Sequence, residues 1–69
     1  MKISARNMLK GKVKRVNIGA VNAEVVLELP GGDIVTAVIT RESAEGMALA
    51  AGKEAYAIIK ASSVLIAVD

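Results

Sequence analysis

Hydrogen-bond donors are the side chains best suited to chemistry in this sequence, and they gather in three short segments outside the predicted strands. A helix N-terminus offers free N–H groups and a partial positive charge, so hydroxyls placed there extend a ready anion site. Lysine and arginine add full charges, and serines add further hydroxyls. The sequence therefore offers a candidate anion-binding set: Ser4, Arg6, Thr40, Ser43, Lys60, Ala61 and Ser62.

Each of these donors also has a structural explanation when it is considered alone. Thr40 and Ser43 can cap the helix that is predicted to follow them, and Lys60 can lie in solvent. Serine hydroxyls commonly stabilise turns by bonding to the local backbone. The residue types by themselves leave both interpretations open.

The residues needed for common enzyme chemistry are missing. There is no Cys and no His, which excludes a Cys or His nucleophile–base pair, disulfides and the usual zinc sites. The seven carboxylates fall on polar strand faces, turns, the helix start and the C-terminus, where such side chains are ordinarily solvated. We therefore predict a binding protein rather than an enzyme.

Three lysines, Lys10, Lys12 and Lys14, alternate along one predicted strand, and such a row can bind nucleic acid. Single-strand binding on β-barrels relies on bases stacking on aromatic rings, but Tyr56 is the only aromatic residue and the net charge is only +2. A lysine-bearing strand more often guards against edge-to-edge aggregation. We expect no nucleic-acid partner, although a nucleic-acid-binding barrel and a plain oligomerisation module remain as alternatives.

Alternating apolar and polar residues predict the strands that carry the donors. Residues 21–29 alternate with a period of two, which predicts a half-buried strand, and the turn after Pro30 leads to an antiparallel partner over residues 34–39. Over residues 9–18 the alternation changes parity, which predicts a bulge or bend near Lys14 and Arg15. Gly11 in the same run predicts sharp strand curvature of the kind that a closing barrel needs.

The second half of the chain predicts one helix and two more strands. Thr40 is a good N-cap for a helix over residues 41–49, and residues 55–59 and 64–68 are apolar runs typical of strands. This order predicts an all-β fold, an OB-type five-stranded Greek-key barrel with one short helix between strands 3 and 4.

Length and composition predict a single domain, residues 1–69, that works as an oligomer. A core of this size rarely stabilises a domain well without disulfides, metals or partner subunits. The chain has 54% apolar residues but no Phe and no Trp, so excess apolar surface should lie between subunits. No apolar run approaches the roughly 20 residues that span a bilayer, and the start lacks the apolar stretch of a secretory signal. We expect a cytoplasmic protein without a membrane partner.

Four segments of the sequence resemble the molbindin, or Mop, domain of the TOBE class. They are SARNMLKGKV (residues 4–13), GAVNAEVVLELPGG (19–32), TAVITRESAEGMAL (36–49) and GKEAYAIIKASSVLIAV (52–68). The resemblance covers nearly the whole chain and is closest to the free-standing members. It implies an OB-type fold, a hexamer arranged as a trimer of dimers, and molybdate or tungstate bound between subunits for molybdenum storage or homeostasis.

The resemblance also implies two kinds of oxyanion site. The principal site would use the seven donors named above, drawn from two chains, and a second site near the threefold axis would use the loop Gly19, Ala20, Val21 and Asn22. Molybdate is a proton-free dianion at neutral pH, so its site should consist of donors only. Phosphate carries a proton that would face a donor in such a site, so phosphate should be disfavoured. Sulfate carries no proton, so only the size of the site can exclude it. Tungstate is nearly the same size as molybdate and should bind about as well.

Overall fold

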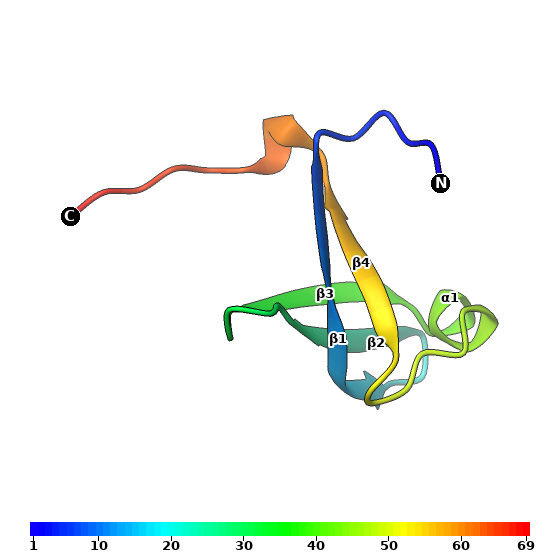
Figure 1. Ribbon diagram of the computed structural model, residues 1–69. Helices are drawn as coiled ribbons and strands as arrows, with labels where there is room; N and C mark the ends of the chain where they lie inside the picture. Colours follow the sequence, from blue (N-terminus) through cyan, green and yellow to red (C-terminus); the bar gives the residue numbers. More distant parts are fainter.

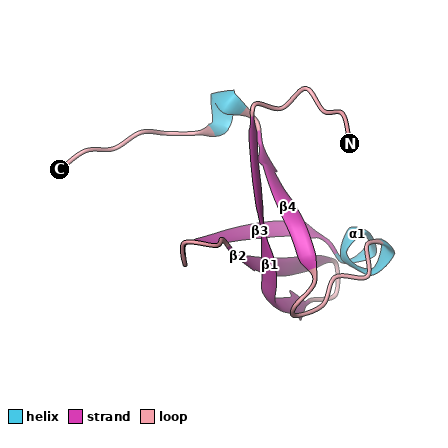
Figure 2. Ribbon diagram, viewed as in Figure 1, coloured by secondary structure: helices cyan, strands magenta, loops and turns pink.

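Four antiparallel strands form one strongly curled sheet in the computed structural model, which describes residues 1–69 (Figures 1 and 2). The elements are β1 (Asn7–Ile18), β2 (Asn22–Glu28), β3 (Ile34–Thr40), α1 (Arg41–Gly46), β4 (Glu54–Ile59) and the 3₁₀ turn η1 (Ala61–Ser63). The strand order in the sheet is β3-β2-β1-β4. Three consecutive strands followed by a fourth that returns beside the first is the Greek-key order that we predicted.

β2 follows the predicted alternation except at Val26, which was predicted on the outer face but is 2% exposed. Ala23, Val25 and Leu27 of β2 are buried against the interior of the curl. Gly32, with a φ of 97°, closes the turn between the strands because glycine enters the left-handed region at little cost. The hairpin therefore provides most of the apolar interior.

β1 pairs with β2 along its second half and with β4 along its first half. The pairing passes from Val13↔Leu27 to Arg15↔Val26, which leaves Lys14 as the extra residue of a bulge. The predicted bulge is therefore confirmed. It adds twist at the point where β1 leaves one neighbour for the other.

Gly11 marks the tightest approach in the sheet. A Cβ atom at this position would overlap the carbonyl oxygen of Glu28 and would lie 3.1 Å from Cγ of Leu27. β1 can therefore cross the end of β2 only because residue 11 has no side chain.

The core is small and aliphatic. It centres on Val13, Val25 and Leu27, and Leu49 packs against this cluster from the loop that follows the helix. Ala44 is the buried residue of α1, which packs against β2 and β3. No helix is long and apolar enough to cross a membrane.

The helix is shorter than predicted. It ends at Gly46 rather than at residue 49, and Ala48 adopts a φ of 51°. This left-handed residue turns the chain so that Leu49 reaches the core. The helix thus ends at a glycine, which is a poor helix former, and the turn that follows brings Leu49 to the core.

The predicted fifth strand over residues 64–68 is wrong for the chain by itself. Leu65, Ile66 and Val68 are 91%, 87% and 92% exposed. The segment leaves η1 and runs away from the sheet, as Figure 1 shows in red. A single chain therefore forms a four-stranded curled sheet with β3 and β4 as open edges, and the five-stranded barrel is not closed.

Candidate oxyanion-binding site

Five of the predicted donors lie at one end of the β1–β4 ribbon. The last pair of this ladder is Asn7↔Ile59, so the segment before β1 and the segment after β4 leave the sheet together. We call these residues the ribbon-end group: Ser4, Arg6, Lys60, Ala61 and Ser62. All five are exposed.

The turn η1 leaves backbone donors free within this group. Ser63 N–H donates to Lys60 O at 2.8 Å and Val64 N–H donates to Ala61 O at 3.2 Å. The first N–H groups of such a turn have no acceptor inside it, and no side chain caps η1. The N–H groups of Ala61 and Ser62 are therefore available in the segment that directly follows Lys60.

Thr40 and Ser43, which we call the helix-start group, form the N-cap of α1. Thr40 Oγ1 accepts a hydrogen bond from Ser43 N–H at 3.0 Å and donates to Ser43 Oγ at 2.8 Å. The capping role considered from the sequence is therefore confirmed. The Ser43 hydroxyl still has its own proton to donate, because Oγ acts only as acceptor toward Thr40.

The loop predicted to form the second site lies next to the helix-start group. Asn22 is the ladder partner of Thr40, and Arg41 N–H donates to Val21 O at 2.8 Å. Gly19 N–H donates to Asn22 O at 2.8 Å and closes the loop. A Cβ atom on Gly19 would lie only 2.9 Å from that oxygen, so glycine is needed here.

The ribbon-end and helix-start groups lie at opposite ends of the sheet. β1 has 12 residues, so its two ends are separated by about 36 Å along an extended strand. η1 and the start of β1 lie together in Figure 2, while α1 lies at the other end of the sheet and packs against β2 and β3. One chain therefore does not bring the seven predicted donors together.

Sequence reasoning missed Asn7. Its Nδ2 donates to the carbonyl oxygen of Ile59 at 3.3 Å, and the side chain is partly buried. The sequence signal for Asn7 was its place in the segment SARNMLKGKV, two residues before the predicted strand over residues 9–18, where a polar residue is too common to single out as a site residue.

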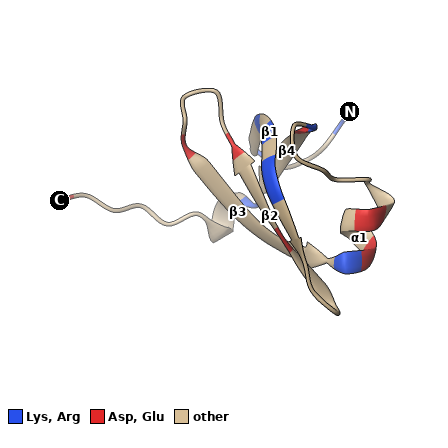
Figure 3. Ribbon diagram, turned by 90° about the horizontal axis from the view of Figure 1, so that it is seen from below, with Lys and Arg blue, Asp and Glu red and all other residues tan.

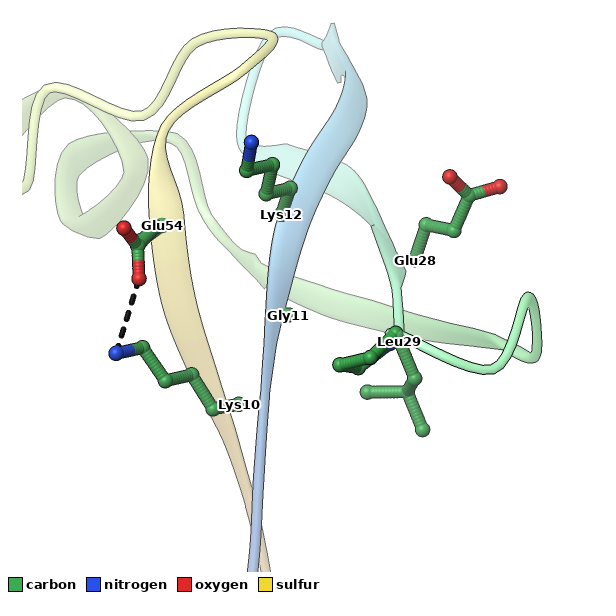
Figure 4. A pocket seen from close by; sticks show the side chains of 7 residues that line it. Lys10, Gly11, Lys12, Glu28, Leu29 and Glu54 are labelled. Atoms are coloured by element: carbon green, nitrogen blue, oxygen red, sulfur yellow. Dashed lines mark ion pairs between the residues drawn. The ribbon is translucent and has the colours of Figure 1, made fainter.

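The larger of the two surface hollows is not an oxyanion site. It has a volume of about 370 Å³ and is lined by Lys10, Gly11, Lys12, Glu28, Leu29, Pro30 and Glu54 (Figure 4). Two carboxylates in this lining would repel a dianion. Lys10 Nζ already lies 3.0 Å from Glu54 Oε2 and 5.9 Å from the Tyr56 ring centroid.

This ion pair perturbs both of its members. The hydrogen bond from Lys10 lowers the pKa of Glu54, and the same bond raises the pKa of Lys10. Basic and acidic residues are interspersed on the sheet and on α1 (Figure 3). The lysine row is therefore balanced by carboxylates and does not form a continuous positive surface. No three carboxylates lie close enough together to hold a metal ion.

A curled Greek-key sheet with exposed donor groups at its two ends defines a small β-sheet binding domain. The sequence matches the TOBE domain family over residues 3–66. The chain therefore belongs to the TOBE family, and its relatives place it in the Mop group of that family. Several relatives are described as molybdenum-pterin-binding or molybdate-binding proteins, and the chain is a binding protein rather than an enzyme.

Three relatives show how far the similarity extends. The chain is 48% identical over 69 residues to a probable molybdenum-pterin-binding protein of Haemophilus influenzae, covering 100% of both chains. It matches the structure of MopII from Clostridium pasteurianum with a TM-score of 0.92 and 45% identity, covering 97% of this chain and 100% of that one. It matches the molybdate-bound form of ModG, a cytoplasmic molybdate-binding protein, with a TM-score of 0.85 and 59% identity, covering 88% of this chain and 43% of that one.

Proposed function

We propose that the chain binds molybdate, with tungstate as a substitute, and serves cytoplasmic molybdenum storage or homeostasis as a single domain, residues 1–69. The observation that carries this proposal is that the donor residues lie at two separate ends of the chain's own sheet. The ribbon-end group and the helix-start group face solvent at opposite ends of one sheet, so a site that contains both must be built from two copies.

The combined groups have the chemistry that molybdate requires. Arg6 and Lys60 supply positive charge, and hydroxyls come from Ser4, Thr40, Ser43 and Ser62. Ala61 contributes through its backbone N–H. None of the seven residues carries a carboxylate, so the shell consists of donors that match an acceptor-only dianion.

The exposed C-terminal segment is a further reason to propose that a second copy of the chain is needed. Residues 64–68 are apolar and uncharged, and exposing such a segment to water is unfavourable. An apolar groove of about 120 Å³ lies between the open edges, with Ala37 and Ile39 of β3 on one side and Ala55 of β4 on the other. We propose that residues 64–68 of one chain lie along these open edges on another, place apolar side chains in the groove and add the fifth strand that closes the barrel.

Reciprocal exchange of this strand gives a twofold dimer, and three such dimers give the proposed hexamer. The loop Gly19, Ala20, Val21 and Asn22 then forms the second kind of oxyanion site, with Asn22 as its side-chain donor. This loop is exposed and lies beside the helix-start group.

Native mass spectrometry combined with molybdenum analysis tests the proposal, because it gives the subunit count and the bound oxyanion together. We expect a hexamer that retains molybdate after desalting. A folded monomer, or an oligomer that retains no molybdate or tungstate, would overturn it. Mobility shift of oligonucleotides with steep salt dependence would instead identify a nucleic-acid-binding barrel.

A further inference from the structure

The ribbon that carries Arg6 and Lys60 has little support from the rest of the sheet. The last pair between β1 and β2 is Lys12↔Glu28, so residues 7–11 of β1 pair only with β4. Met8 and Ile58, which face each other near the end of the ribbon, are 44% and 42% exposed. A two-stranded ribbon is only marginally stable in water, so its end will fray unless it is held.

Asn7 supplies the only side-chain hydrogen bond at this end. Its amide Nδ2 donates to the carbonyl of Ile59 across the final rung of the ladder, at 3.3 Å. Asn7 directly follows Arg6, and Ile59 directly precedes Lys60. The bond therefore joins the residues that directly adjoin Arg6 and Lys60.

We propose that Asn7 is a positioning residue for the oxyanion site, an inference that rests on the function proposed above. Arg6 and Lys60 carry like charges, which oppose their approach until an anion lies between them. The Asn7 amide holds the two segments at a fixed separation before the ligand arrives. Because an amide is neutral, it does so without a carboxylate that would compete with the oxyanion for Arg6.

The expected consequence is a loss of affinity without a loss of assembly. Asn7→Ala removes one neutral hydrogen bond, and molybdate binding should weaken about three- to tenfold. The apolar groove and the C-terminal segment do not include Asn7, so the subunit count should stay the same.

A double-mutant cycle distinguishes positioning from general stability. Molybdate is titrated calorimetrically into the assembled wild type, Asn7→Ala, Lys60→Ala and the double variant. If Asn7 acts by placing Lys60, its replacement has little further effect once the ammonium is gone. Full additivity of the two losses, or an unchanged affinity in Asn7→Ala, overturns the inference.

Asn17→Ala is the matched control. Asn17 lies on the same strand, and its Nδ2 bonds to Glu24 Oε1 at 3.4 Å, far from the ribbon end. Its replacement should leave the affinity unchanged, and an equal loss would contradict the proposal.

If the alanine variant does not assemble, Asn7→Thr replaces it in the cycle, because threonine is a good strand former. Failure of both variants to assemble would show that Asn7 serves folding instead. A wild type that binds no molybdate would refute the proposed function, whereas the outcomes above concern Asn7 alone.

Discussion

Asn22 lies directly opposite Thr40 in the β2–β3 ladder. This pairing places the loop that ends at Asn22 and the start of α1 at one corner of the molecule, and Arg41 N–H reinforces it by donating to Val21 O at 2.8 Å. The ribbon-end group lies at the other end of β1. Substitutions at the two ends should therefore affect the site through different subunits.

Loss of a charged donor should weaken oxyanion binding and leave assembly intact. Arg6→Ala and Lys60→Ala each remove a hydrogen bond to a charged group, worth about 1.5–3 kcal/mol, so each should cost about one to two decades of affinity. Calorimetric titration with molybdate measures the change. Lys10→Ala is the control, because Lys10 is paired with Glu54 outside the site; an equal loss there would mean that diffuse charge does the binding.

A charge in the C-terminal segment should block assembly. Ile66 is 87% exposed in the single chain and becomes buried if the segment closes a partner's barrel, so Ile66→Asp would bury an unpaired carboxylate. Light scattering at micromolar concentration should show smaller species. Ala51→Asp adds the same charge in an exposed turn and should assemble normally. If Ile66→Asp assembles as the wild type does, the exchange of residues 64–68 between chains is ruled out.

Oxyanions should stabilise the protein in the order of their fit to a shell of donors. A ligand that binds only the assembled native state raises its stability by mass action. Thermal unfolding should shift upward with molybdate and equally with tungstate, little with phosphate, and by an intermediate amount with sulfate. An equal shift with phosphate and molybdate would show that the site selects charge alone.

Gly11→Ala should destabilise the fold. Its Cβ would overlap the Glu28 carbonyl oxygen, and forcing such an overlap typically costs about 1–3 kcal/mol. Denaturant unfolding gives the free energy of unfolding for the variant. Gly31→Ala provides the comparison, since a Cβ there meets no atom within 4 Å. Similar losses at both positions would contradict the close crossing of β1 and β2.

The Lys10–Glu54 pair should make a small pH-dependent contribution to stability. The pKa of Glu54 is lowered by Lys10 in the folded state, so this contribution is present above its usual value of 4.5 and is lost as the pH falls through the lowered value. Glu54→Gln should flatten the decline of stability in acid, as measured by unfolding below pH 5. Lys10→Ala, which removes the other member of the same pair, should flatten the decline in acid in the same way.

The sequence by itself determined the local parts of this protein. The alternation around Val25 defines β2, the change of parity defines the bulge at Lys14, and Thr40 caps α1, as predicted. Each of these features depends on residues within a few positions of one another, and strand period and capping chemistry act over that range. The donor residue types could also be recognised without a structure.

Only the tertiary structure decided how distant parts lie relative to one another. The turn after α1 brings Leu49 to the core, and residues 64–68 after η1 lie away from their own sheet. The ladder pairs Asn7 with Ile59, which gathers two donor segments at one end and leaves Thr40 at the other. Strand order and register depend on contacts between residues far apart in the chain, and local residue patterns do not specify those contacts.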